Sequence, residues 1–318
     1  MSKKLISIAV KLIALLFFVL AIYLFYHEIH KLGWSKVVNQ LKGFPLRILI
    51  LAVLLVFCDY VFLSGYDFLA LRYLGVQIKR SVVFKTAFIS FSVTNSTGHA
   101  YLAGGAIRYF FYSKLGLTQI QVIKMIAFES LTFLMGMGMV LDVCLILSYF
   151  FHIPKMHTYQ GMLNFSAIVI SLALFIYICF FVCLKKKFKL SVTEIKLPSI
   201  QMTFKQILLG ASDIISASLV FYILFSFHLD ADYLHVAVIF LIAQLIGVST
   251  QVPGGLGVFE ATFLYLFDPS KDEKAGVFAV LIAFRVLYYF LPLLISCLFM
   301  LFDLCKTVLR KNHLIKHP

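Results

Sequence analysis

Long runs of apolar residues are the feature that most constrains how this chain can fold. A helix of about 20 residues spans the roughly 30 Å of hydrocarbon in a bilayer. Backbone groups in lipid must bond within their own segment, and these runs lack the apolar–polar alternation of barrel strands. We therefore predict an all-α, polytopic membrane protein with about six full spans, at residues 5–26, 46–71, 120–150, 163–184, 204–227 and 275–304.

Composition leaves little material for a soluble domain. Of the 318 residues, 62% are hydrophobic and 13% are charged, whereas soluble domains carry about 25% charged residues. The longest polar stretch inside the chain covers residues 185–205, and an independent domain needs at least about 50 residues. We predict a single integral membrane domain over residues 1–318. The first run is too long for a signal peptide and is interpreted as a retained helix.

The net charge of +14 indicates orientation in a membrane more than nucleic-acid binding, because the cations lie mainly in short loops. With both termini in the cytoplasm, 16 basic residues lie inside and 6 outside, and the other 6 of the 28 lie within apolar segments or at their edges. Cytoplasmic loops usually carry this excess, so we predict a bacterial inner-membrane protein with cytoplasmic termini. The six cysteines include no C-x-x-C pair, and we expect no metal site and no cofactor.

Two further apolar stretches are interrupted. The first, residues 82–112, contains the polar segment at residues 94–99 and then Gly104 and Gly105. The second, residues 234–267, contains the segment at residues 249–257, which includes Pro253, Gly254, Gly255 and Gly257. Glycine costs a helix interior about 1 kcal/mol and proline about 3 kcal/mol. We expect each stretch to form two half-helices or a re-entrant hairpin broken at these residues.

The predicted orientation brings the two broken stretches in from opposite sides of the membrane. This arrangement predicts an inverted repeat, with halves at about residues 45–150 and 204–304. In transporters, a pair of interrupted segments at corresponding positions is the best sequence-level indication of the substrate site. We therefore expect a substrate path between the two breaks.

Charged residues inside the apolar segments are the candidates for that path. A charge at the centre of a membrane helix costs about 2.5–3.5 kcal/mol on insertion scales, so such residues are usually paired, hydrated or functional. Each predicted half offers two acids and one arginine. The six candidate substrate-path residues are Asp59, Arg108, Glu129, Asp213, Glu260 and Arg285.

These side chains also have ordinary structural explanations. Arg108 and Glu129 could lie at the membrane interface, and the others could bond a neighbouring helix or form a structural salt bridge. Asp67 and Asp142 lie nearer to the ends of their runs, and we interpret both as structural. His99 could relay protons, although we expect neighbouring backbone groups to satisfy it. The spacing of His27 and its neighbours does not match that of a zinc helix.

The stretch from Pro253 to Gly257 could open a helix whose free N–H groups point at the site. The N-terminus of a helix carries partial positive charge and binds anions, so a phosphate headgroup would fit there. A packing kink is the alternative. A dinucleotide fingerprint is a poor match, because the G-x-G-x-x-G pattern is incomplete and no strand–turn–helix unit surrounds it.

Several of these motifs together resemble one known family. The similar segments, which include a Pro-Gly-Gly-x-Gly-x-x-Glu stretch, are Gly98, Gly104–Tyr109, Lys114–Leu117, Glu129 and Val252–Glu260. They resemble the transmembrane region of lysylphosphatidylglycerol synthase, the multiple peptide resistance factor, and its stand-alone relatives. The resemblance covers about residues 8–305.

The resemblance implies a function in lipid transport. In bifunctional members the membrane domain is thought to flip aminoacylated phospholipid, which a separate cytosolic domain makes from aminoacyl-tRNA. No polar stretch of this sequence is long enough for that second domain, so a flippase-like phospholipid translocase is expected rather than an enzyme. The alternatives are a membrane-embedded lipid-modifying enzyme, similar to phosphatidylglycerol lysyltransferase, and a non-catalytic partner of a lipid-synthesis complex. The expected partners are a membrane phospholipid and, as an open alternative, a second subunit.

Overall fold

The computed structural model describes residues 34–97, 100–150, 188–190, 193–195, 198–250 and 252–315, with residues 172 and 176. The predicted span at residues 5–26 lies outside this part of the chain. So does the span at 163–184, apart from residues 172 and 176. The pair Gly98 and His99 lies outside it as well.

Helices dominate the described structure. Four stretches within it are long and apolar enough to cross a membrane, namely Leu46–Tyr73, Gln119–Ser148, Ile200–His228 and Lys274–Asp303. They belong to α3 (Leu46–Tyr73), α6 (Gln119–Phe150), α8 (Ile200–His228) and a continuous run of α11 (Lys274–Phe284), η4 (Arg285–Phe290) and α12 (Leu291–Ile315). The prediction of a helical, multi-pass membrane protein is confirmed, while the total of about six spans stays a prediction.

The outer surface of the bundle is apolar, as a lipid environment requires. Large side chains such as Leu54, Phe57, Leu208 and Leu298 are more than half exposed. Soluble monomers rarely leave such large side chains exposed in contiguous patches. The short helix α2 (Trp34–Gly43) precedes α3, and a small antiparallel hairpin of β1 (Phe188–Leu190) and β2 (Thr193–Ile195) precedes α8.

The first interrupted stretch is a helical hairpin, but its break is not at the predicted glycines. Helix α4 (Arg80–Ser96) ends at Thr97, and α5 (Ala100–Tyr112) contains both Gly104 and Gly105. These glycines instead permit close packing. A Cβ on Gly104 would lie 1.9 Å from Thr94 Oγ1, and one on Gly105 would lie 2.6 Å from Ile126 Cδ1. The short η1 (Ser113–Leu115) follows α5.

The second interrupted stretch breaks where the sequence predicts. Helix α9 (Tyr233–Ser249) is followed by η3 (Pro253–Gly255) and α10 (Val258–Phe267). Gly254 and Gly257 have φ angles of 58° and 78°, a left-handed conformation that glycine adopts without steric cost. The chain therefore reverses at this point.

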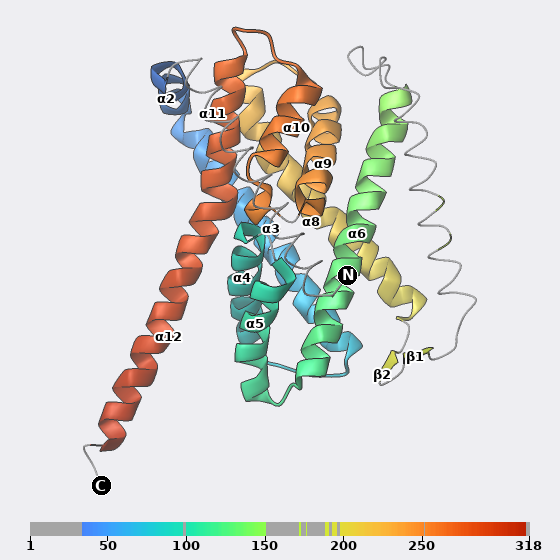
Figure 1. Cartoon of the computed structure of the whole chain (residues 1–318), viewed down its shortest axis with the longest axis vertical. Coiled ribbons are helices and arrows are strands. Elements are labelled where there is room, and N and C mark those ends of the chain that lie inside the picture. The colour runs from blue at the N-terminus through green and yellow to red at the C-terminus, as the bar shows by residue number, and fades with distance from the viewer. Residues whose placement is uncertain are drawn as a thin grey trace, which may run out of the picture.

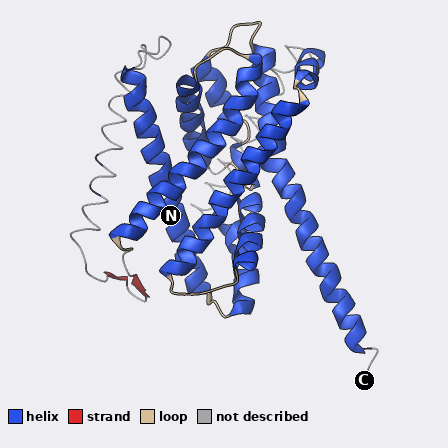
Figure 2. Cartoon of the chain, turned by 180° about the vertical axis from the view of Figure 1, so that it is seen from behind, coloured by secondary structure: helices blue, strands red, loops and turns tan. Residues whose placement is uncertain are grey.

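The two hairpins lie in opposite halves of the bundle, as Figure 1 shows for α4 and α5 below and α9 and α10 above. The reverse view in Figure 2 shows the long helices running past both of them. Their tips approach each other in the middle of the molecule, since a Cβ placed on Gly254 would lie 3.4 Å from the main-chain oxygen of Asn95. The breaks of two segments far apart in sequence thus share one location.

Helices α6 and α8 cross at a pair of glycines. A Cβ on Gly136 would lie 2.2 Å from the carbonyl carbon of Gly210, so the two backbones are in direct contact. Small residues allow this close approach between membrane helices. Beside the crossing, Gln206 Nε2 donates to Thr132 Oγ1 at 3.0 Å. This crossing fixes the position of α6, which carries one of the candidate site residues.

Candidate functional site

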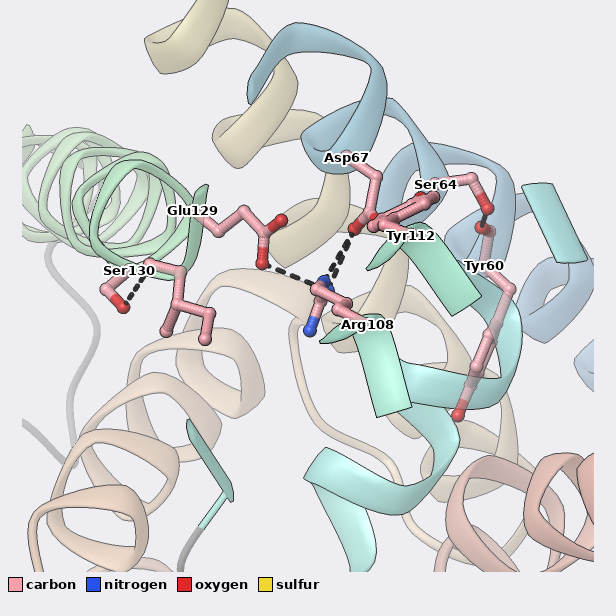
Figure 3. Close-up of polar contacts among 8 residues, drawn as sticks. Tyr60, Ser64, Asp67, Arg108, Tyr112, Glu129 and Ser130 are labelled. Atoms are coloured by element: carbon pink, nitrogen blue, oxygen red, sulfur yellow. Dashed lines mark hydrogen bonds and ion pairs between the residues drawn. The ribbon is translucent and has the colours of Figure 1, made fainter. Parts of the chain in front are cut away.

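Arg108 on α5 forms the first charged centre of the site. Its Nη2 lies 2.8 Å from Asp67 Oδ1 on α3 and 3.0 Å from Glu129 Oε2 on α6. Tyr112 donates its hydroxyl to Asp67 Oδ2 at 2.7 Å. Figure 3 shows Arg108 between the two carboxylates, with Tyr112 beside Asp67. Three helices are therefore joined by one buried guanidinium, which also lies over the ring of Phe91.

Arg285 on η4 forms the second charged centre. Its Nε donates to Glu260 Oε1 at 2.6 Å, and its Nη atoms donate to the main-chain oxygens of Gly254 and Gly255. Glu260 Oε2 in turn accepts a hydrogen bond from the Gly257 N–H at 2.6 Å. Every part of this centre therefore serves to fix the turn between α9 and α10.

The contact between Glu260 and Gly257 changes the interpretation of this helix N-terminus. The sequence suggested that the N–H groups there are free to receive a phosphate. In the structure the carboxylate of Glu260, in the first turn of α10, accepts the N–H at the cap position itself. A carboxylate at the third position of a helix commonly does this. The N–H of Gly257 is therefore satisfied from within the chain, and the carboxylate of Glu260 occupies this end of α10.

Two further acids face each other between the charged centres. Asp59 on α3 and Asp213 on α8 are buried where these two helices pack together, beside the hydrogen bond from Ser216 Oγ to the main-chain oxygen of Leu55. Tyr288 donates its hydroxyl to Asp59 Oδ2, and Tyr66 donates to Asp213 Oδ2, each at 2.6 Å. The two acids thus have tyrosine donors instead of basic partners.

A cavity of about 150 Å³ lies where the hairpin tips meet. Thr94, Asn95 and Thr97 line it from the first hairpin, and Val252, Gly254 and Gly255 line it from the second. Of the predicted site residues, Arg108, Glu129 and Asp213 line the cavity. Asp59, Glu260 and Arg285 do not line it, and contact the residues that form its wall. The structure therefore brings all six predicted charges to one region, but only half of them to the cavity surface.

The charges of this region are not balanced. Among the described residues that line or adjoin the cavity, five acids accompany two arginines: Asp59, Asp67, Glu129, Asp213 and Glu260 against Arg108 and Arg285. Oε1 of Glu129 is buried without a hydrogen-bond partner in the described structure. A buried carboxylate oxygen without a donor is costly. The cavity therefore has unsatisfied capacity for a cationic or hydrogen-donating group.

Asp67, which the sequence led us to interpret as structural, is part of the first charged centre. It is completely buried and is the shortest contact of Arg108. Its distance of eight residues from Asp59, about two helical turns, could have suggested that both acids lie on broadly one side of α3. The role of the tyrosines has no comparable signal, because tyrosine is frequent throughout this sequence.

Comparison with known proteins identifies one family and several relatives to which this chain is similar. The family model for the lysylphosphatidylglycerol synthase TM region matches residues 8–296. The "Uncharacterized protein slr0712" of Synechocystis is 33% identical over 92% of this chain and 90% of its own length. The "Inner membrane protein YbhN" of Escherichia coli is 26% identical over 96% of both chains.

A longer relative shares the same region. The "Phosphatidylglycerol lysyltransferase" of Bacillus subtilis is 26% identical over 94% of this chain, which corresponds to 34% of the length of that enzyme. The similarity therefore covers about a third of the enzyme and nearly all of this chain. Four helical stretches of the described residues are long and apolar enough to cross a membrane, and the family model matches most of the sequence. The chain therefore belongs to the lysylphosphatidylglycerol synthase TM region family.

Proposed function

We propose that this protein moves a phospholipid with a charged headgroup between the two leaflets of the membrane. The observation that carries the proposal is the cavity between the two hairpin tips, which presents Arg108 and Glu129 side by side in an otherwise apolar bundle. A headgroup needs such a polar compartment to pass hydrocarbon, while its acyl chains can stay in lipid.

The side chains at the cavity suggest which headgroup would fit. Arg108 can bind a phosphate through two parallel hydrogen bonds, although Asp67 and Glu129 now occupy its donors. The free Oε1 of Glu129 would accept from an ammonium group. A headgroup with both a phosphate and an amine would therefore exchange partners with this ion-pair cluster without leaving a buried charge alone.

The architecture suggests how access could alternate. We propose that α3 to α6 and α8 to α12 form inverted repeats, within halves at about residues 45–150 and 204–304, in a single membrane domain. In this arrangement the hairpins are re-entrant and enter from opposite leaflets, with cytoplasmic termini. Transporters with inverted repeats place the substrate between broken helices and move one repeat against the other. The meeting of the tips at the cavity supports this arrangement.

Lipid movement in reconstituted vesicles tests the proposal. Purified protein would be placed in vesicles with a fluorescent amine-bearing phospholipid, and the accessible fraction of label would be followed with a membrane-impermeant quencher. We expect label to exchange faster than in protein-free vesicles, and faster than for a matched lipid without the amine. Exchange at the protein-free rate would contradict the proposal, and a covalently altered lipid would indicate an enzyme instead. Asp303→Asn is a suitable control, because its ion pair with Lys85 is partly exposed and lies outside the cavity.

A further inference from the structure

The Asp59–Asp213 pair is a second acidic feature with a different chemistry from the arginine centres. Both carboxyl groups are buried, at 0% and 3% exposure. They lie at the same level of the contact between α3 and α8, because Ser216, one turn after Asp213, donates its hydroxyl to the main-chain oxygen of Leu55, one turn before Asp59. Two carboxylates at such close range in a nonpolar interior do not both stay ionised, because each disfavours the charge of the other. Sharing a single proton is the usual solution for such a pair.

The surroundings of the pair contain no base that could neutralise it instead. From α3, Cys58, Tyr60 and Tyr66 face the two acids, and from η4 Tyr288 and Tyr289 do so. Glu129 on α6 is the next acid, beyond Tyr66. Among the described residues, neither Asp59 nor Asp213 forms an ion pair. Both nearby arginines are already bonded to other carboxylates.

The two acids differ in their access to the cavity. Asp213 lines it, whereas Asp59 does not, and Oδ1 of Asp59 has no hydrogen-bond partner in the described structure. A proton on the pair can therefore reach the cavity through Asp213, while Asp59 stays enclosed. Asp213 is also on the same cavity surface as Glu129, where the proposed headgroup amine would lie.

The hydrogen bonds of the pair lead to the two elements, α3 and η4, that carry Asp67 and Arg285. Tyr66, which donates to Asp213, is adjacent in sequence to Asp67, the partner of Arg108. Tyr288, which donates to Asp59, follows Arg285 by three residues within η4. π-Helical segments such as η4 are often found at functional sites. A change in charge at the pair therefore acts on the two elements that hold the hairpin tips.

We propose that the Asp59–Asp213 pair is a proton site that couples lipid movement to the proton gradient by antiport. At rest the pair holds one proton. When a headgroup amine enters the cavity, its positive charge replaces that of the proton, which leaves Asp213 for cavity water. After the lipid departs, the pair takes up one proton from the opposite side. This inference rests on the proposed lipid transport and adds its driving force.

An imposed pH difference across vesicles that contain the full chain tests the coupling. With fluorescent amine-bearing phospholipid in both leaflets, antiport predicts accumulation of label in the leaflet that faces the acidic compartment. The double variant Asp59→Asn/Asp213→Asn, which leaves no carboxyl in the pair, should still equilibrate label but should show no accumulation. Asp303→Asn should accumulate label like the unmodified protein.

Each outcome separates the coupling from the transport itself. Lipid exchange that reaches the same distribution with and without the gradient would overturn the coupling and leave the proposed transport intact. Absence of any exchange would overturn both. An infrared measurement gives a readout that needs no transport: the unmodified protein should show the carbonyl band of a buried protonated carboxyl, and the double Asn variant should lose that band. Absence of that band from the unmodified protein would also overturn the proposal.

Discussion

Arg108 and Arg285 carry the same charge and are similarly buried, but their partners differ. Arg285 bonds one carboxylate and two main-chain oxygens, and all of these belong to the hairpin turn or to the first turn of α10. Arg108 bonds two carboxylates from two different long helices, and it also lines the cavity. We call the Arg285 centre the closed centre, because its bonds all lie within one turn, and the Arg108 centre the open centre, because Arg108 lines the cavity.

This difference separates a positioning role from a binding role. A guanidinium whose hydrogen bonds all go to the local turn can change partners only if that turn unfolds. A guanidinium between two carboxylates can release one of them to an incoming phosphate, because the second still balances its charge. Within the proposed function, Arg108 is therefore the residue that binds the phosphate, and Arg285 stabilises the second hairpin.

Arg285→Ala should have the largest effect, and the effect should be on stability. The substitution leaves Glu260 buried without its partner and removes donors from the carbonyls of Gly254 and Gly255. Removing one partner of a buried ion pair typically costs about 3–5 kcal/mol. We expect a strongly lowered unfolding temperature in detergent, measured by a thermal-shift assay that does not use tryptophan fluorescence. Glu260→Gln combined with Arg285→Met should recover part of the loss, and equal stability of the single variant and the unmodified protein would remove the distinction.

Arg108→Lys should affect transport more than stability. Lysine keeps a positive charge between Asp67 and Glu129 but cannot form the paired hydrogen bonds of a guanidinium with phosphate. We expect a loss of roughly tenfold in the lipid exchange rate, equivalent to about 1.4 kcal/mol, with a much smaller change in unfolding temperature than for Arg285→Ala. Vesicle exchange normalised to inserted protein measures it. A fully active Arg108→Lys variant would argue against phosphate binding at this residue.

The two helix breaks differ in how far the sequence could predict them. The second break follows from local chemistry, since Pro253 and three glycines cannot continue a helix at low cost. The first break lies in the predicted polar segment at residues 94–99, where α4 ends, and not at Gly104 and Gly105, because these glycines are compatible with a helix when a neighbouring helix approaches closely. Their use depends on Thr94 and Ile126, which contact them only in the folded structure.

The candidate site was predictable as a set of charges but not as a set of pairs. Membrane burial makes every charge stand out in an apolar run, and this identified all six candidates. Pairing depends on which helices lie side by side, so the contact of Arg108 with Asp67 was missed, whereas the pairing of Glu260 with an arginine was anticipated. The tyrosine donors of Asp59 and Asp213 were not identified either, because a hydrogen bond between α3 and η4 joins residues 229 positions apart.

Glu129→Gln should change selectivity at the open centre. The amide keeps the shape of the side chain but removes the negative charge that would attract a headgroup amine. We expect the preference for an amine-bearing lipid over an amine-free lipid to fall by about fivefold, equivalent to about 1 kcal/mol. Exchange of the two lipids by the same vesicles measures this ratio. Glu260→Gln is the matched change at the closed centre, and it should leave the ratio unaltered; a similar fall in both variants would contradict the assignment.

Tyr112→Phe should have the smallest effect and tests how firmly Asp67 is held. The substitution removes the hydroxyl that donates to Asp67 Oδ2, while Arg108 still binds Oδ1 through Nε and Nη2. A single buried hydrogen bond contributes about 1 kcal/mol net, so we expect a modest fall in unfolding temperature. Lipid exchange should stay near that of the unmodified protein, because Tyr112 does not line the cavity. If exchange instead falls as far as in Arg108→Lys, the position of Asp67 governs the guanidinium, and the open centre depends on α3 as much as on α5.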